Sequence, residues 1–224
     1  MNKRLIEYLS SFTTPERFEL FKKIIENRTR YMTVALEDIY QAHNASAVLR
    51  SCDCFGVQDV HIIENNNEYN VSPDVAVGSD KWLSLYKYNE LENNTLNAIN
   101  KLKKNAYRIV ATTPHSNDVN LEDFDLEKGK FALFFGAELP GLSDIVMDNA
   151  DEFLKIPMYG FTESFNISVS AAITMHTLYN KLRKTNIKWQ VSSQEKEDIL
   201  FEWLKKSVKS SDMLIERFIS GHQS

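Results

Sequence analysis

A helix-like stretch near the start of the chain, HNASAVLRSCDCFG (residues 43–56), carries two side chains that can bind an electron-rich atom. Its apolar residues recur at the spacing of a buried helix, yet Asn44 stands at its start and Arg50 in its second turn. Both side chains donate hydrogen bonds, and the guanidinium keeps its positive charge. A helix cap and a surface arginine would explain the same two residues, and this alternative stays open.

A second polar segment, GAELPGLS (residues 136–143), follows an apolar run typical of a buried strand. Glu138 stands where a phosphate would need to approach bare backbone, so the segment differs from the glycine-rich loop of dinucleotide-binding proteins. A carboxylate at this place favours a ligand with hydroxyl or ammonium donors. The alternative is a plain turn in which Glu138 points into solvent.

A third segment, TESFNISVS (residues 162–170), places a surplus of small polar residues at the start of a helix. These residues are Ser164, Asn166, Ser168 and Ser170. A helix start needs only one such residue as a cap. The small apolar residues that follow, Ala171 and Ala172, fit either a buried helix or a subunit interface.

Strands and helices that alternate along the chain must position these segments. The strand-like runs are residues 31–36, 59–64, 82–88, 107–113, 130–136 and 152–158. The helical segments between them are residues 44–55, 90–105 and 143–150. This order predicts an α/β fold with a parallel sheet and helices on both faces, in which ligands bind beyond the carboxyl ends of the strands.

Helices without intervening strands are expected at both ends of the chain. They are residues 2–27 with a break near Thr13-Thr14-Pro15, a long helix over 166–184 and an amphipathic helix over 194–209. We therefore expect three parts: an N-terminal helical extension (1–30), a central domain (31–184) and a C-terminal helical extension (185–224).

Charge is unevenly distributed along the 224 residues, whose net charge is −5. Residues 1–31 hold seven Lys or Arg against four Asp or Glu, and residues 181–209 hold eight against four. Residues 32–180 hold ten against twenty-one. Basic ends around an acidic centre favour a polyanionic partner held at the ends, although solvated helix faces would give the same counts.

Composition limits the class of protein. No run approaches the ~20 apolar residues of a membrane span, and the start, MNKRLIEYLSSF, lacks a secretory signal, so we expect a cytoplasmic protein. Cys52 and Cys54 have no second pair to complete a metal site, and the five histidines lack ligand spacing. We therefore expect no metal and no membrane partner.

Taken together, three motifs resemble those of the SpoU/TrmH family of the SPOUT superfamily. They are N-x-x-x-x-x-R at 44–50, G-x-E-x-x-G-L-S at 136–143 with IPM at 156–158, and S-x-N-x-S-V-S at 164–170. The resemblance covers residues 31–184 in the family's order and spacing. Its local departures are Phe165, where leucine is usual, and Ala137 and Leu139-Pro140 around Glu138.

The resemblance implies an S-adenosylmethionine-dependent RNA 2'-O-ribose methyltransferase. It is strongest to the members that methylate guanosine 18 in the tRNA D-loop, which are also short enzymes with a helical extension at each end. It further implies a C-terminal deep trefoil knot, a homodimer, and a cofactor held in the knot largely by backbone groups. These groups are expected at Thr112, Gly136, Ile156 and Phe165.

The resemblance also assigns catalytic roles. Arg50 would act on the 2'-oxygen, as an electrostatic stabiliser or as a general base, and Asn44 would fix Arg50 or the ribose. Glu138 would orient Arg50 or a substrate hydroxyl, and Ser164 and Asn166 would line the reacting pocket. A guanidinium pKa above ~12 makes the neutral form costly, which favours the electrostatic role.

Basic residues in and near the first and last helices are the candidates for tRNA contact. They are Arg17, Lys22, Lys23, Arg28, Arg30, Lys205, Lys206 and Lys209. Other interpretations stay open: methylation of rRNA or of another tRNA position, or a non-catalytic RNA-binding paralogue. Without appeal to a family, an ordinary nucleotide-binding α/β enzyme is a further alternative, although the phosphate-loop glycines are missing.

Overall fold

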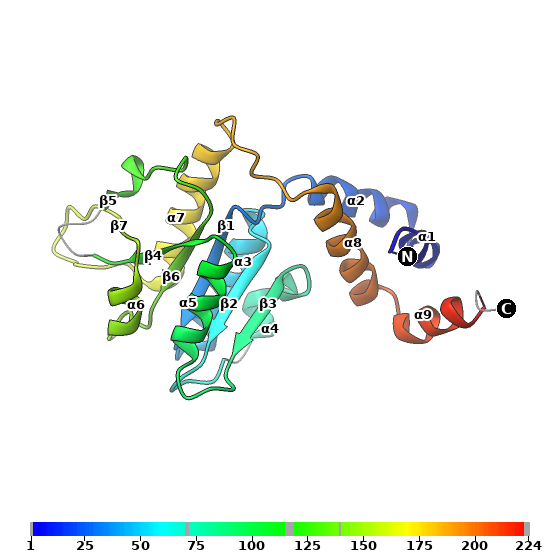
Figure 1. Ribbon diagram of the computed structural model, residues 1–224, viewed down its shortest axis with the longest axis horizontal. Helices are drawn as coiled ribbons and strands as arrows, with labels where there is room; N and C mark the ends of the chain where they lie inside the picture. The colour runs from blue at the N-terminus through cyan, green and yellow to red at the C-terminus, as the bar shows by residue number, and fades with distance from the viewer. Residues whose placement is uncertain (1, 70–71, 115–118, 139, 222–224) are drawn as a thin grey trace. The chain divides into compact units, whose positions relative to one another are not determined.

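Buried apolar strands form a parallel sheet in the larger of two compact units. The computed structural model of the chain describes residues 2–69, 72–114, 119–138 and 140–221. Its strands are β1 (Met32–Glu37), β2 (Asp59–Ile63), β3 (Ser84–Tyr88), β4 (Arg108–Thr112), β5 (Val119–Asn120), β6 (Phe131–Phe135) and β7 (Glu152–Lys155). They lie in the order β3-β2-β1-β6-β4-β7-β5 with every neighbouring pair parallel (Figure 1). The prediction of a parallel sheet is confirmed.

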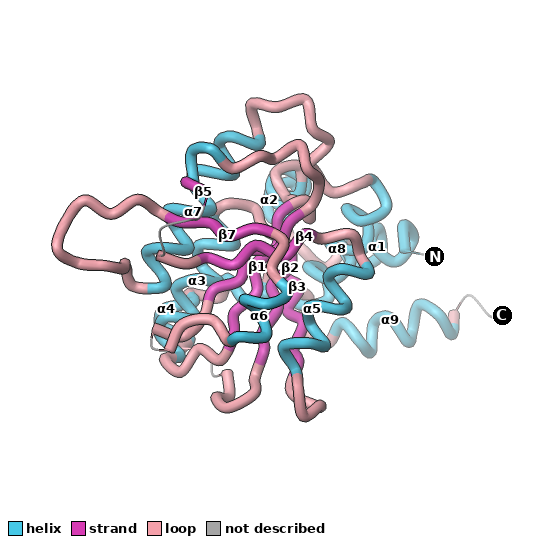
Figure 2. The backbone as a smooth tube through the Cα atoms, turned by 60° about the vertical axis from the view of Figure 1, so that its left-hand side comes forward, coloured by secondary structure: helices cyan, strands magenta, loops and turns pink. Residues whose placement is uncertain are grey.

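Helices cover both faces of this sheet, as Figure 2 shows. One face carries α3 (Ala42–Cys54) and α7 (Ile167–Leu182), and the other carries α5 (Asn94–Lys104) and α6 (Asp144–Asn149). Side chains of β6 alternate between the two cores: Phe131, Leu133 and Phe135 face the first, and Ala132 and Phe134 face the second. Strands β1, β2 and β6 are buried over their full length, which explains why β6 is apolar throughout and why β1 and β2 do not alternate between apolar and exposed polar residues.

Some element boundaries differ from those expected. Neither β5 nor the short helix α4 (Pro73–Ala76) is predicted from the sequence, because two to four residues are too few to show a period. Helix α3 begins at Ala42 with Gln41 as its N-cap residue, so the expected start at Asn44 is wrong and Asn44 lies inside the first turn. Helix α7 does begin directly after Asn166, whose side-chain oxygen accepts a hydrogen bond from the N–H of Ser168.

Residues up to Arg28 and from Gln190 onward form the second compact unit, and Thr29–Trp189 form the first. The helices of the second unit are α1 (Asn2–Ser10), α2 (Pro15–Ile25), α8 (Ser193–Ser207) and α9 (Ser211–Ser220). Trp203 of α8 is buried, and its ring lies 5.7 Å from that of Phe21 in α2. The two ends of the chain, expected as separate extensions, thus pack on each other, since a short amphipathic helix needs a partner to bury its apolar face.

Membrane-spanning helices and metal-binding groups of side chains can be assessed for the described residues. Among the helices that the structure describes, none combines the length and apolar character needed to cross a membrane. In the same part of the chain, no group of three or more His, Cys, Asp or Glu side chains is arranged to hold a metal ion.

Candidate functional site

Three side chains from distant segments meet beyond the carboxyl ends of β1 and β6. Asn44 Nδ2 donates to Glu138 Oε1 at 3.0 Å, and Asn166 Nδ2 donates to the same oxygen at 2.7 Å. Asn166 Nδ2 also donates to Asn44 Oδ1 at 3.1 Å. The three polar segments of the sequence therefore form one hydrogen-bonded cluster, the Asn44–Glu138–Asn166 cluster.

The orientation of each amide in the cluster is fixed by its other partners. Asn44 is 4% exposed, and its Nδ2 also donates to Gln41 Oε1 at 3.1 Å. Asn166 Oδ1 accepts from the backbone N–H and the hydroxyl of Ser168, at 2.8 and 2.6 Å. Each amide nitrogen is thereby directed at the carboxylate. Glu138 Oε2 accepts no hydrogen bond from the described residues, which leaves an acceptor for a ligand.

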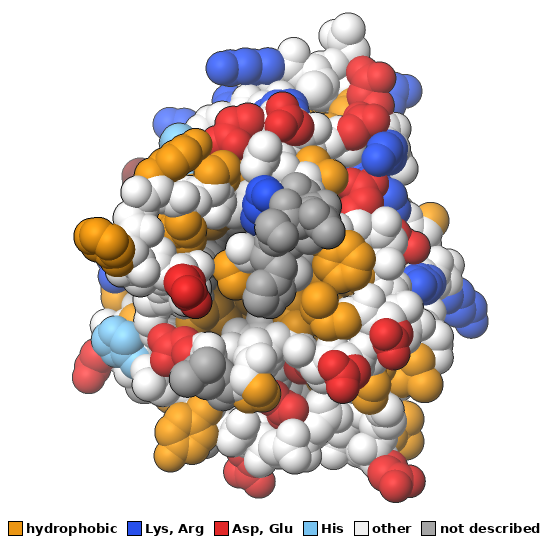
Figure 3. Space-filling model, turned by 90° about the vertical axis from the view of Figure 1, so that its left-hand side faces the viewer, with side chains coloured by type: hydrophobic (Ala, Val, Ile, Leu, Met, Phe, Trp, Pro, Cys, Tyr) orange, Lys and Arg blue, Asp and Glu red, His pale blue; other side chains and the backbone are white. Residues whose placement is uncertain are grey.

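A cavity of about 540 Å³ adjoins this cluster. Its walls come from the ends of β4, β6 and β7 and the segments that follow them, from α6 and from α7. The lining residues are 112–114, 135–138, 140–142, 147, 154–156, 158, 163–165, 167, 170 and 174. Figure 3 shows hydrophobic side chains around a hollow on one face of the molecule. The volume lies within the range of small-molecule and cofactor sites.

The residues expected to hold a cofactor lie together in this wall. Thr112, Gly136, Ile156 and Phe165 come from four segments, and all four line the cavity. The Thr112 hydroxyl donates to the carbonyl of Phe134 at 2.7 Å, so its side chain already has a partner within the sheet. Recognition by backbone groups is consistent with this arrangement.

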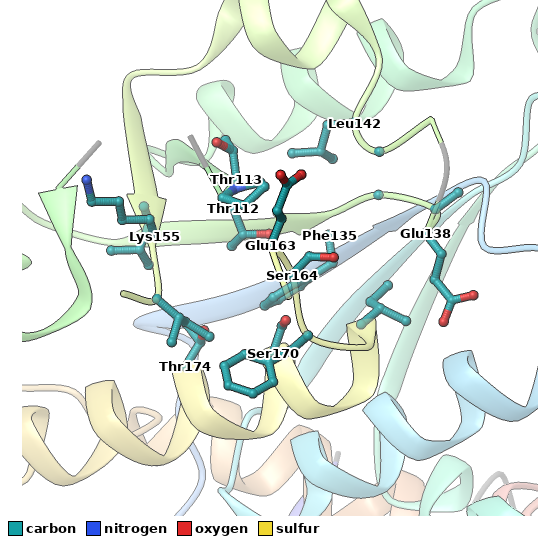
Figure 4. Close-up of a pocket in the computed structure, with 18 of the residues that line it drawn as sticks. Thr112, Thr113, Phe135, Glu138, Leu142, Lys155, Glu163, Ser164, Ser170 and Thr174 are labelled. Atoms are coloured by element: carbon teal, nitrogen blue, oxygen red, sulfur yellow. The ribbon is translucent and has the colours of Figure 1, made fainter. Parts of the chain in front are cut away.

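Polar side chains mark different parts of the cavity. Figure 4 places Glu138 on one side and Lys155 on the other, with Glu163 and Ser164 between them. Sequence reasoning missed Lys155 and Glu163 as lining residues, and it missed Gln41 as a partner of Asn44. Lys155 directly precedes the IPM segment, but a single lysine at a strand end carries no signal of its own.

Among the expected catalytic residues, Asn44, Glu138 and Asn166 form the cluster and Ser164 lines the cavity, whereas Arg50 does neither. It is exposed on α3, does not line the cavity, and makes no hydrogen bond or ion pair within the described residues. Six residues after Asn44 on a helix correspond to a rotation of about 240° and a rise of about 9 Å. The backbone of α3 therefore directs Arg50 away from Glu138.

Among the basic residues expected to contact tRNA, Arg28 requires a correction. Its side chain is 1% exposed, and its guanidinium lies 5.1 Å from the ring centre of Trp203, so it cannot reach a phosphate. Arg30 belongs to the central unit and forms an ion pair with Asp59 at 3.0 Å.

The other six basic candidates lie in the terminal unit, and five of them are exposed. These five are Arg17, Lys22, Lys23, Lys206 and Lys209. Lys22 pairs with Glu19 at 2.8 Å and Lys205 with Asp212 at 3.5 Å, and such solvent-exposed ion pairs are weak enough to exchange partners.

Comparison with known proteins identifies the family of the chain. The model of the SpoU rRNA Methylase family matches residues 31–176, which include Asn44, Glu138 and Asn166. The chain belongs to the SpoU family. The match begins at the first strand and ends within α7, so the terminal unit lies outside it.

Several SpoU relatives match over most of the chain. The tRNA (guanosine(18)-2'-O)-methyltransferase of Borreliella burgdorferi is 43% identical over 216 residues, covering 96% of both proteins. The A. aeolicus TrmH/SpoU tRNA modifying enzyme has a TM-score of 0.77 at 25% identity, covering 87% of this chain and 98% of that one.

A more distant structure shares the fold alone. The SpoU methyltransferase AviRb from Streptomyces viridochromogenes, in complex with AdoMet, has a TM-score of 0.61 at 19% identity. The alignment covers 73% of this chain and 65% of that one.

Glycine is required at position 136 because the backbone of Gly141 lies close to its Cα. A Cβ added there would lie 2.3 Å from the carbonyl carbon and oxygen of Gly141, whereas a Cβ at Gly160 meets nothing within 4 Å. We expect Gly136→Ala to lower the free energy of unfolding by about 1–3 kcal/mol, as overpacking does. Gly160→Ala should change it by less than about 0.5 kcal/mol. Urea unfolding of both variants measures the difference, and equal stabilities would contradict the close approach.

Proposed function

We propose that this SpoU-family chain is an S-adenosylmethionine-dependent tRNA (guanosine(18)-2'-O)-methyltransferase. The observation that carries this assignment is the 43% identity to the B. burgdorferi enzyme over 96% of both chains. Such coverage includes the terminal unit as well as the SpoU domain. The cavity beside the Asn44–Glu138–Asn166 cluster supports this assignment.

The residues of the cavity fit S-adenosylmethionine. The wall is made of four loop segments with backbone groups at Thr112, Gly136, Ile156 and Phe165, and no glycine-rich phosphate loop is present among them. The ligand has no phosphate and carries an ammonium group, which agrees with a site that presents the carboxylates of Glu138 and Glu163. We propose that these four segments hold the cofactor.

The chemistry of methyl transfer explains the polar cluster. The bound cofactor would supply a methyl group on a sulfonium, so positive charge is lost at sulfur while negative charge develops on the ribose 2'-oxygen, whose proton leaves to an RNA phosphate or to water. A cation near that oxygen stabilises the transition state more than the ground state, and we assign this role to Arg50. Asn44 and Asn166 fix the Glu138 carboxylate, whose free Oε2 can accept from a donor of the substrate. Ser164 lines the same cavity.

The position of Arg50 supports a homodimer. Arg50 does not line the cavity of its own chain, so we propose that it completes the cavity of a second copy. Large exposed apolar side chains accompany the site, namely Tyr40 before α3 and Tyr159 and Phe161 in the segment between β7 and α7. Exposed apolar groups of this size are typical of a surface that a partner covers.

We also propose that the chain after β6 forms a deep trefoil knot. The sheet order places β6 between β1 and β4, and β7 on the other side of β4, so the segments after β6 and β7 emerge at one edge. Both segments line the same cavity, together with the start of α7. A path of the chain after β6 that passes through no loop formed by the preceding residues would contradict the knot.

The terminal unit is the proposed tRNA-binding surface. It contains the accessible basic candidates Arg17, Lys22, Lys23, Lys205, Lys206 and Lys209. Phosphate contacts of this kind hold a folded RNA without reading its sequence.

We also expect the protein to act in the cytoplasm and without a metal ion.

Methyl transfer to defined RNA tests the function. Incubation with labelled S-adenosylmethionine and unmodified tRNA should place one methyl group on the 2'-oxygen of guanosine 18. A tRNA with 2'-deoxyguanosine at that position should accept none, because the acceptor oxygen is missing. Methylation of rRNA or of another tRNA nucleotide instead would establish the alternative substrate and contradict the assignment.

Replacement of Arg50 tests the electrostatic role. Arg50→Lys should lower the rate of methyl transfer roughly 10²-fold, the scale of a lost oxyanion donor, because an ammonium cannot reproduce the guanidinium geometry. Arg183→Lys, at another exposed arginine of the central unit, is the matched control and should retain the wild-type rate. Single-turnover kinetics with unfolding curves measure both, and an Arg50→Lys rate near that of wild type would remove Arg50 from the chemistry.

Salt dependence tests the tRNA-binding surface. Replacing Lys23, Lys206 and Lys209 with Gln should weaken tRNA binding and lower the slope of log affinity against log salt by about 1 per lysine that contacts a phosphate. The control replaces three exposed lysines of the central unit, Lys81, Lys103 and Lys104, and should leave the slope unchanged. An unchanged slope in the first variant would contradict the assignment.

A further inference from the structure

A buried carboxylate lies behind the wall of the cavity. Glu37 is the last residue of β1 and is 2% exposed. Alternation along the strand directs its side chain to the face covered by α5 and α6, opposite to the side chain of Leu36. It is therefore on the other side of the sheet from Asn44, and it does not line the cavity.

Hydrogen bonds engage both oxygens of this carboxylate. Ser143 donates twice, from its backbone N–H to Oε2 at 2.9 Å and from its hydroxyl to Oε1 at 2.7 Å. The Thr95 hydroxyl of α5 donates to Oε1 at 2.6 Å. A buried charge is costly unless such donors surround it, and three charge-assisted bonds of this length make a strong anchor.

The anchor acts at one end of a loop that builds the site. The loop of residues 136–143 begins where β6 ends, and Ser143, its last residue, caps α6 by accepting from the N–H of Val146. Between these ends the loop carries Glu138 and much of the cavity wall. Its start is fixed by the sheet, so the position of Glu138 depends on how its other end is held.

We propose that Glu37 is a positioning residue for methyl transfer. By holding Ser143, it fixes the end of the segment that carries Glu138. Glu138 can then contact Asn44 and Asn166, and the cavity wall keeps the shape that binds the ligand. Thr95 in turn orients the Glu37 carboxylate, and we call these three residues the Glu37–Ser143–Thr95 clamp. The Thr95 hydroxyl also accepts from Asn65 Nδ2 at 2.8 Å, which joins the clamp to the segment after β2. The identity of the ligand rests on the proposed function, whereas the clamp rests on the contacts alone.

Substitutions can weaken the clamp without changing the cavity lining. Glu37→Gln keeps the size of the side chain but has only one acceptor oxygen, so the Ser143 N–H or hydroxyl loses its partner. Ser143→Ala removes only the hydroxyl donor and keeps the hydrogen bond from the backbone N–H. Thr95→Val removes the third hydrogen bond, and Thr95→Ser restores it.

The adjacent carboxylate provides a matched control. Asp38 Oδ1 accepts from the backbone N–H groups of Asn65, Asn66 and Asn67, at 2.7, 2.8 and 3.3 Å. Burial raises the pKa of this carboxyl, but these hydrogen bonds outweigh it and bring the pKa below its ordinary value. Asp38→Asn therefore perturbs a structural carboxylate at the same edge of the sheet and leaves both Ser143 contacts of Glu37 in place, and it reaches Thr95 only through the shared donor Asn65.

Calorimetry with S-adenosylmethionine and no RNA tests the proposal on the full-length protein. We expect Glu37→Gln to weaken binding at least tenfold and to raise KM for the cofactor more than it lowers kcat. Asp38→Asn should change binding less than twofold, even where its loss of stability in urea is as large. The Glu37→Gln, Ser143→Ala double variant should bind S-adenosylmethionine no more weakly than whichever single variant binds it less tightly, because both substitutions break the same set of hydrogen bonds.

Specific results would overturn the proposal. Binding of Glu37→Gln within twofold of wild type, or an equal loss in Asp38→Asn, would show that Glu37 has only a structural role. If Glu37→Gln does not fold, Ser143→Ala and the comparison of Thr95→Val with Thr95→Ser decide by the same criterion. Failure of the wild-type protein itself to bind S-adenosylmethionine would instead reject the proposed function.

Discussion

One carboxylate holds together three segments that are far apart in the sequence. Glu138 Oε1 receives amide hydrogen bonds from Asn44 on α3 and from Asn166 at the start of α7. These bonds fix Glu138 against two helices on the same face of the sheet. Both amides are held by further neighbours, so the cluster is ordered before any ligand arrives, which is the condition for electrostatic catalysis.

A physical reason explains why the cavity is suited to hold a ligand through backbone groups. A loop that binds phosphate needs successive free N–H groups, and its glycines leave a visible fingerprint. Here the wall is assembled from the ends of strands that are adjacent in the sheet but distant in the chain, and Gly136 is needed because it lies against the backbone of Gly141. A ligand without phosphates can be held by such a wall with few distinctive side chains.

Much of the fold could be predicted from the sequence, because strands buried on both faces give apolar runs and because Asn166 and Ser143 are recognisable helix caps. Family resemblance named the polar residues of the site but gave no distances. The separation of Arg50 from the cluster and the clamp at Glu37 depend on contacts between distant segments, which no local pattern encodes. Burial of Arg28 likewise depends on Trp203, 175 residues further along the chain.

The pairing of the two chain ends has a consequence for biosynthesis. Helices α1 and α2 are synthesised before the central unit, but Trp203, whose ring packs on Phe21, is synthesised after it. Contacts of such long sequence separation form late. A nascent chain thus completes its catalytic domain before the unit proposed to grip tRNA exists, so an unfinished polypeptide would have little hold on the abundant tRNAs that surround the translating ribosome.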